Sequence, residues 1–467
     1  MDFINDFILS INDFIWTYIL IAMLIAIGVY FTFKTKFVQF TNFKEMFKLL
    51  GEGTNSKEKS KGQVSSFQAF CIGTASRVGT GNLAGVASAI AIGGAGAVFW
   101  MWLIALIGSA SAFIESTLAQ IYKTKQKNGS YVGGPAYYME KALGKRWLGI
   151  IFSILITITF GLIFNSVQSN TIALAMNEAF GTSNVIIGIL LTIITLVIIF
   201  GGVHRVSKVS EVIVPVMALA YIFVALIVVV MNITQIPSLI TLIVKSAFGA
   251  EQVVGGTMGA ALLTGIKRGL FSNEAGMGSA PNAAATATVT HPVKQGLIQT
   301  LGVFTDTIII CTCTAFIILL SGVDLNSNLE GIQLTQNALS SQVGAWGSYF
   351  IAFCILLFAF SSIVGNYYYG EANIEFLTDK KIYLTLYRLF VGAMVFFGSI
   401  ANLNIVWNLA DVFMGLMAVL NLIVIALLGK FAFRALEDYR AQKKAGIKEP
   451  VFKASSIPEL KNADEWN

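Results

Sequence analysis

The chain has 467 residues, of which 56% are hydrophobic and only 12% are charged, against about 45–50% and about 25% in an ordinary soluble domain. This composition excludes a string of soluble domains, because so many apolar side chains can be buried only in lipid. The net charge of +6 lies in short Lys and Arg clusters between apolar segments, so it indicates membrane topology and not nucleic-acid binding. The four cysteines lie inside apolar runs and predict no disulfide or metal framework.

Stretches of about 20 apolar residues, the length that spans a bilayer, recur along the whole chain. They predict an all-α polytopic membrane protein with eleven transmembrane helices. The predicted helices cover approximately residues 14–33, 67–92, 97–122, 147–176, 184–202, 211–231, 253–287, 295–321, 345–370, 382–400 and 405–429. The fourth is long for one crossing, so we expect its end to bend or to lie at the membrane interface.

Positive charge alternates between the two sides of these helices. The segment 34–66 holds seven lysines and the segment 123–146 holds five lysines and Arg146, whereas 93–96 and 401–404 hold neither Lys nor Arg. Because positively charged loops stay in the cytoplasm, the N-terminus is predicted outside and the C-terminus inside. The chain is expected in a bacterial or archaeal plasma (inner) membrane.

Five segments follow from this topology. They are an extra N-terminal helix (1–33), a cytoplasmic amphipathic segment and linker (34–66), a first repeat (67–231), a second repeat (253–429) and a cytoplasmic tail (430–467). Residues 41–50 have the pattern of an interfacial helix with lysines available to anionic lipid. The tail is predicted to begin as a helix and to end disordered.

Two predicted spans are poor membrane helices. The second contains RVGTGN at 77–82, and the seventh contains glycines and charges from 264 to 281, where we place the break at 265–269. A charge at mid-membrane costs at least ~2.5 kcal/mol, so such sequences are tolerated where the backbone lines a cavity. The amides freed by a break suit a carboxylate, and the carbonyls suit a desolvated cation.

The two breaks are five helices apart, in helices that cross the membrane in opposite directions. This spacing predicts a 5+5 inverted repeat of helices two to six and seven to eleven, with helix one as an addition, and it points to a transporter site. The alternative is that the glycines only allow close helix packing. Close packing explains the small residues at 84–89 (AGVASA). It would leave Arg77 and Asn82, which flank the first break, without polar partners in lipid or in an apolar core.

Three long motifs resemble the alanine/glycine:cation symporter family, also called sodium:alanine symporters. They are SRVGTGNLAGVASAIAIGGAGAVFWMW at 76–102, GGPAYYMEKALG at 133–144 and RGLFSNEAGMGSAPNAAATA at 268–287. The likeness covers the predicted helices two to eleven. It implies the leucine-transporter fold and a sodium symporter that imports a small neutral amino acid, alanine or glycine. A monomer would suffice for transport, and the oligomeric state stays open.

The resemblance also implies which residues bind the substrate. The amides of Thr80 and Gly81 would hold the carboxylate, and Gln168 would reach the carboxylate or the ammonium, which its neighbours Asn165 and Asn170 would not. Carbonyls of the seventh-helix break would face the ammonium. The implied substrate-binding residues are Gly79, Thr80, Gly81, Asn82, Gln168, Leu262, Gly265, Ile266, Lys267, Gly269 and Asn366.

The co-transported sodium ion would lie between the carbonyl oxygens of Ala75 and Val78 and the hydroxyls of Ser361 and Ser362, by the same resemblance. Hard oxygen ligands of this kind suit a hard cation. Relatives that use protons often carry a lysine in the sixth helix, and residues 212–231 contain none. Sodium is therefore favoured over protons.

One position departs from the family's pattern. Many members have Gly-Trp before Tyr-Tyr-Gly-Glu, where this chain has Gly365-Asn366. An amide in place of an indole makes the pocket more polar or larger. Glutamine or another polar neutral amino acid, with sodium or proton coupling, is therefore the alternative.

Three acids, Glu115, Asp306 and Asp411, lie inside predicted spans, and an intramembrane acid is a functional candidate by default. For Asp306 the alternative is structural, because nearby hydroxyls and backbone could supply its hydrogen bonds. Glu115 has the position of a hydrogen-bonding anchor between helices. Asp411 has the position of a gate or of a packing residue. A channel would show a repeated filter or charge ring. An intramembrane enzyme would need a metal set or an activated nucleophile, and the predicted spans contain no His.

Overall fold

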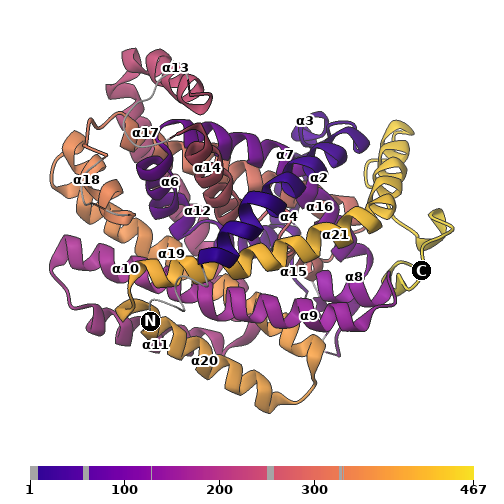
Figure 1. The fold of residues 1–467 in the computed structure, drawn as a ribbon. Helices are drawn as coiled ribbons and strands as arrows, with labels where there is room; N and C mark the ends of the chain where they lie inside the picture. The colour runs from indigo at the N-terminus through magenta and orange to yellow at the C-terminus, as the bar shows by residue number, and fades with distance from the viewer. Residues whose placement is uncertain (1–8, 56–62, 128, 250–256, 326–328, 330) are drawn as a thin grey trace.

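The computed structural model describes residues 9–55, 63–127, 129–249, 257–325, 329 and 331–467. Within these ranges the chain is almost entirely helical, and its one small sheet is the hairpin that pairs Thr124 with Val132 and Lys125 with Tyr131. Figure 1 shows the helices as a bundle, with the long α21 crossing it from one end to the other.

The elements follow one another with short connections. In chain order they are η1 (Ile15–Leu20), α2 (Ile21–Lys34), α3 (Val38–Thr41), α4 (Phe43–Asn55), α5 (Ser66–Arg77), η2 (Gly81–Gly85), α6 (Val86–Gly93), α7 (Gly96–Ile121), β1 (Thr124–Lys125), β2 (Tyr131–Val132), α8 (Pro135–Lys141), α9 (Arg146–Ile156), η3 (Thr157–Phe164), α10 (Asn165–Phe180), α11 (Asn184–Ile199), α12 (Gly202–Met231), η4 (Ile233–Gln235), α13 (Ile236–Ala247), α14 (Met258–Asn273), α15 (Ala280–Thr286), α16 (Pro292–Val303), η5 (Phe304–Cys311), α17 (Thr312–Leu319), α18 (Ile332–Val343), α19 (Trp346–Leu377), α20 (Lys381–Ile400), α21 (Leu403–Lys444), η6 (Ala454–Ser456) and η7 (Asp464–Trp466).

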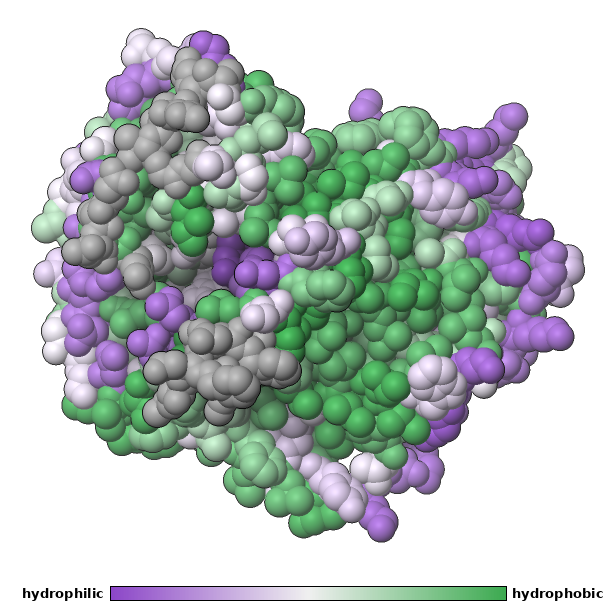
Figure 2. Space-filling model, in the orientation of Figure 1, coloured by the Kyte–Doolittle hydropathy of each residue, from purple (hydrophilic) through white to green (hydrophobic). Residues whose placement is uncertain are grey.

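The outer surface is that of a membrane protein. Among the described residues, eight helices are long and apolar enough to cross a bilayer, and three shorter apolar helices accompany them. Figure 2 shows an apolar belt across the molecule with polar residues gathered at both ends. The exposed residues on α11 and α20 include Ile193 and Phe390, which face lipid where a soluble protein would carry polar side chains. The prediction of an all-α polytopic fold is confirmed.

The first predicted break is present. α5 begins with a capping box made by Ser65 and Gln68 and ends at Arg77, and helix resumes with η2 at Gly81. Arg77 is buried and donates from Nη1 to the side-chain oxygen of Gln299, 3.1 Å away. The guanidinium therefore points into the protein and away from lipid, as expected for a break that lines the interior, and its Nε and Nη2 atoms have no hydrogen-bond partner among the described residues.

The second break lies elsewhere than predicted. α14 is continuous from Met258 to Asn273, so the prediction of a break at 265–269 is wrong. The helix stops at Glu274, which has a φ of +59°, and α15 starts at Ala280. Gly265 and Gly269 instead face α7: a Cβ at Gly265 would lie 2.4 Å from the carbonyl oxygen of Ala97. Residues 253–256 of the predicted seventh span lie outside the described residues.

The structure differs from the predicted helices at three further places. The fourth predicted helix is one run of helix from Arg146 to Phe180, with a π-helical segment in its middle. The helices α13 and α18 occupy stretches predicted as loops, and both lie at the end of the molecule away from the C-terminus (Figure 1). α21 extends to Lys444, so the tail does begin as a helix, as predicted, but it continues the last span without the predicted boundary at 429.

The end of the chain packs onto the protein, so the prediction of a disordered end is wrong. The indole nitrogen of Trp466 donates to the carbonyl oxygen of Gln120 at 2.9 Å, and the ammonium of Lys123 lies 4.6 Å from the Trp466 ring centre. Phe452 donates from its backbone to Thr290 O. Residues 56–62 of the predicted linker lie outside the described residues.

Candidate functional site

The first break and the fourth helix meet at a hydrogen bond. The backbone nitrogen of Thr80 donates to Oε1 of Gln168 at 2.9 Å, and a Cβ at Gly79 would lie 2.7 Å from the same oxygen. The neighbours Asn165 and Asn170 are turned elsewhere, to Gly161 O and to Gly398 O. Gln168 alone of the three amides reaches the break, and its contact with a substrate stays a prediction.

Asn82 closes the break from its far side. Its Oδ1 accepts from the Gly79 nitrogen at 2.8 Å, and its Nδ2 donates to Asp306 Oδ1 at 2.7 Å. Asp306 also accepts from Ser272 Oγ at 2.7 Å and from Thr307 Oγ1 at 2.8 Å. A buried carboxylate with three donors is fully paired. The structure therefore gives Asp306 the role of joining helices η2, α14 and η5 behind the break.

Oxygen atoms suited to a cation gather where α5 ends. Ser361 Oγ lies 3.4 Å from Ala75 O, and Ser362 Oγ lies 3.2 Å from Val78 O. Both hydroxyls also reach the carbonyl oxygen of Phe358, at 2.8 and 3.1 Å. All five residues are buried. Two hydroxyl and three carbonyl oxygens without a carboxylate form a set that can bind a monovalent hard cation.

Phe358 O is a candidate cation ligand that sequence reasoning missed. The signal was present, because a serine hydroxyl in a helix commonly bonds to the carbonyl three or four residues earlier. Ser361 and Ser362 therefore share Phe358 as that residue.

An aromatic group covers the break on the side of α14. Phe271 packs between Phe164 and Trp407, with ring centres 4.6 and 4.7 Å away. A Cβ at Gly81 would lie 3.0 Å from the Phe271 ring and 3.1 Å from the Ser272 Cα, so a side chain there would have to displace α14 or the ring by a few tenths of an ångström. Phe164 precedes Gln168 by one helical turn, which places its ring and the Gln168 amide on one face.

A cluster of four polar side chains, here named the Ser76 cluster, lies beside the same break. Ser76 Oγ lies 2.6 Å from Glu274 Oε1 and 2.6 Å from Asn366 Oδ1, and Ser279 Oγ donates to Glu274 Oε2 at 2.6 Å. The Nδ2 atom of Asn366 is buried and has no hydrogen-bond partner among the described residues. The cluster thus offers an unpaired amide donor inside the bundle.

The residues predicted on the seventh helix contribute less to this site. Lys267 Nζ lies 3.2 Å from Asn12 Oδ1 and 3.4 Å from Asp411 Oδ2, so it faces the N-terminal helix. Arg268 forms a two-pronged ion pair with Asp411, at 2.9 and 3.1 Å. Leu262 is half-buried and Ile266 is buried on an unbroken helix. Phe271 and Ser272, one turn further along, are the α14 residues that touch Gly81.

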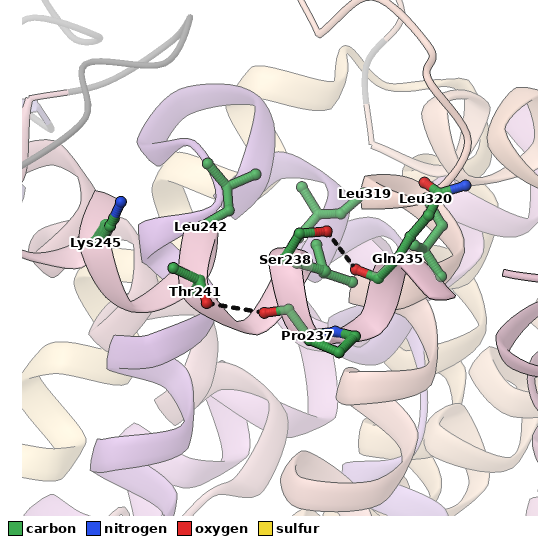
Figure 3. A pocket seen from close by; sticks show the side chains of 9 residues that line it. Gln235, Pro237, Ser238, Thr241, Leu242, Lys245, Leu319 and Leu320 are labelled. Atoms are coloured by element: carbon green, nitrogen blue, oxygen red, sulfur yellow. Dashed lines mark hydrogen bonds between the residues drawn. The ribbon is translucent and has the colours of Figure 1, made fainter. Parts of the chain in front are cut away.

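A separate groove of about 660 Å³ runs along η4 and α13, from Gln235 to Lys245. Figure 3 shows its lining, with Ser238 and Thr241 turned to carbonyl oxygens of their own helix, Gln235 O and Pro237 O. Leu319 and Leu320 close it from α17. Its hydroxyls are already paired, and it is shallow and open, so it is not the candidate site.

A membrane bundle with an interrupted helix, break amides held by side-chain oxygens and a buried set of hydroxyl and carbonyl oxygens is typical of the class of secondary transporters. The comparison with known proteins agrees. The profile of the sodium:alanine symporter family matches residues 1–454. The chain belongs to this family, and it is a sodium-coupled amino-acid symporter and not an enzyme.

Individual relatives cover nearly the full chain. "Amino-acid carrier protein AlsT" of Bacillus subtilis is 58% identical, over 99% of this chain and 98% of its own. "Probable sodium/glutamine symporter GlnT" of the same organism is 57% identical, over 97% and 94%. "Sodium/alanine symporter AgcS" of Methanococcus maripaludis is 38% identical, over 92% and 95%.

The fold is also that of a solved transporter. The crystal structure of MhsT in complex with L-phenylalanine superposes with a TM-score of 0.51 at 15% identity, covering 81% of this chain and 96% of that one. This likeness concerns the fold alone.

Proposed function

We propose that the protein imports alanine or glycine together with sodium, with the substrate carboxylate at the first break. The observation that carries this proposal is the position of two groups on one short segment. Val78 O belongs to the oxygen set for the cation, and Thr80 N, two residues later, is an amide donor whose partner Gln168 is neutral. A carboxylate can take the place of the Gln168 oxygen on that amide, because a charged acceptor binds more strongly.

Coupling follows from this arrangement. A sodium ion at the carbonyls that end α5 and a carboxylate at the amides that resume the helix attract each other in a medium of low dielectric constant. Each ligand then raises the affinity for the other by the same factor. No ionised side chain is needed, and the ring of Phe271 with its neighbours keeps water from the pair.

Glutamine is the second candidate, favoured by the Ser76 cluster. A buried amide donor without a partner costs about 1–3 kcal/mol, and Nδ2 of Asn366 is in that state. A carboxamide side chain would supply the missing acceptor, which a methyl group cannot. The relative named for glutamine is 57% identical to this chain, whereas the relatives named for alanine are 38% to 44% identical.

The proposal includes the topology predicted from loop charge. Eleven crossings in two inverted repeats would place the N-terminus outside and the C-terminus in the cytoplasm of a bacterial or archaeal cell. Transport would need one copy of the chain. Sodium is the coupling ion, and a proton is the alternative.

Uptake into proteoliposomes tests the proposal. Labelled alanine, glycine and glutamine are supplied with sodium or choline outside, with and without a protonophore. We expect concentrative uptake of alanine and glycine that requires sodium and survives the protonophore. Uptake of glutamine alone would favour the second candidate, and uptake abolished by the protonophore at constant membrane potential would replace sodium by protons.

A further inference from the structure

The second break contains a pair of backbone amides that point at one side chain. The nitrogen of Gly276 lies 3.1 Å from Glu115 Oε1, and the nitrogen of Gly278 lies 3.0 Å from Glu115 Oε2. Gly276 and Gly278 have φ angles of +89° and +82°. This left-handed backbone, which glycine adopts without strain, turns both N–H groups toward the same carboxylate.

A second group of residues fixes that carboxylate. Nδ2 of Asn421 donates to Glu115 Oε2 at 2.8 Å and to Gly276 O at 2.9 Å. Tyr138 donates to Asn421 Oδ1 at 2.5 Å. Glu115, Asn421 and Tyr138 are all completely buried. They come from α7, α21 and α8, so three separate helices hold the second break at one point.

The two breaks are therefore satisfied in different ways. At the first, the Thr80 amide is held by a neutral and flexible Gln168 side chain. At the second, the amides are held by a carboxylate with three donors, and its hydrogen bonds are of the stronger charge-assisted kind. A substrate carboxylate that competes for the second break would have to displace an equal charge from a dry site.

We propose that Glu115 is a positioning residue that acts as a built-in carboxylate ligand of the second break. It holds residues 274–279 in their unwound form and occupies the amides there. The Ser76 cluster, which contains Glu274 and Ser279, is thereby kept in place. With the second break occupied, a substrate carboxylate can bind only at the first break, and this consequence rests on the proposed function. The role of Glu115 at the second break does not.

Chemical rescue tests this role. Glu115→Ala leaves a space lined by the Gly276, Gly278 and Asn421 donors, and formate has the charge and shape to fill it. We expect at least a tenfold lower maximal uptake rate in E115A, with the half-saturating sodium concentration within twofold of wild type. Added formate should restore a substantial part of that rate.

Glu115→Gln is the matched control. It keeps the volume of the side chain but sets its NH₂ group against one of the two N–H donors, and it leaves no space for formate. E115Q should lose uptake like E115A and should not respond to formate. Wild-type uptake by E115A, or an equal effect of formate on both variants, would overturn the proposal.

A binding measurement separates this inference from the proposed function. Formate should raise the apparent unfolding temperature of purified E115A in detergent, and not that of E115Q or the wild type, because it binds the folded state of E115A alone. This result does not depend on which amino acid is transported. Failure of wild-type alanine uptake would count against the proposed function, and failure of formate to stabilise E115A would count against the role of Glu115.

If E115A does not fold, Asn421→Asp supplies the same test. It sets a second carboxylate beside Glu115, so uptake should be lost. The double variant E115Q/N421D returns one carboxylate to the break and should recover part of the rate. A double variant no better than either single one would overturn the proposal.

Discussion

Gln168 Oε1 and the backbone nitrogen of Thr80 are joined by a hydrogen bond of 2.9 Å across 88 residues of sequence. The bond connects the middle of the fourth predicted helix to Thr80, the residue that precedes η2, where helix resumes after the first break. It pairs a donor that a substrate carboxylate needs with an acceptor that a rotamer change can withdraw. In the proposed site, a substrate carboxylate would replace the Gln168 oxygen on the Thr80 amide.

Gln168→Glu should weaken amino-acid binding strongly. The new carboxylate keeps an acceptor for Thr80 N but repels the substrate carboxylate in a buried site. We expect the KM for the amino acid to rise at least tenfold, which corresponds to about 1.4 kcal/mol. Gln168→Leu, with neither acceptor nor charge, should raise it less. Uptake kinetics of the two variants decide the point, and an unchanged KM in Q168E would place the carboxylate elsewhere.

Ser361→Ala and Ser362→Ala should each raise the half-saturating sodium concentration severalfold, because one of five oxygen ligands is lost. Sodium titrations of initial uptake rates measure the effect. Ser399→Ala is the control, since Ser399 is equally buried in α20 and bonds only to its own helix at Val395 O. Sodium dependence like wild type in both serine variants would remove them from the cation site.

Gly265→Ala should impair the protein through packing, since α14 is not broken there. The added methyl group would meet Ala97 O at 2.4 Å and the Trp100 side chain at 2.8 Å. Such overpacking typically costs about 1–3 kcal/mol. Gly259→Ala, on the same helix, adds a methyl group with nothing closer than 3.8 Å. We expect a lower unfolding temperature and reduced uptake for G265A alone, and equal stability of the two variants would contradict the close contact of α14 with α7.

Asn366→Leu should change substrate preference. It replaces the amide by an apolar group with the same branching at Cγ, so a substrate with a carboxamide loses a polar partner that alanine does not use. Competition of unlabelled glutamine and alanine against labelled substrate, wild type beside variant, measures the change. We expect at least a fivefold weaker competition by glutamine and alanine competition within twofold. Equal losses for both would mean that Asn366 supports α19 and does not face the substrate.

The parts of the site that sequence could predict are those carried by short, unusual segments. The break at 78–80 can be predicted from local sequence alone, because its glycines lie between the charge of Arg77 and the side-chain amide of Asn82. Ser361 and Ser362 are adjacent, so the cation site follows once the helices are paired by family resemblance. The structure places both sets together, 286 residues apart in the bond from Ser361 to Ala75.

The second break was misplaced because two kinds of glycine occur on one span. Gly265 and Gly269 are spaced by one turn and pack on α7, as in helix pairs with small residues at the contact. Gly276 and Gly278, two residues apart and followed by Pro281, are those with left-handed backbone. The spacing distinguishes the two kinds: glycines four residues apart lie on one helix face and pack, whereas glycines two residues apart before a proline mark the break. The contact of Glu115 with this break spans 161 residues, and no local pattern predicts it.

The length of α21 has a mechanical consequence. Asp411, near one end, is paired with Lys267 and Arg268. Tyr439 and Lys443, near the other, both contact Glu45 of α4. The 28 residues from Asp411 to Tyr439 span about 42 Å at 1.5 Å per residue. If α21 moved as one rigid helix, a rotation of about 5° about Asp411 would displace Tyr439 by about 4 Å, so its length would turn a small adjustment at one ion pair into a side-chain-sized movement at the opposite end.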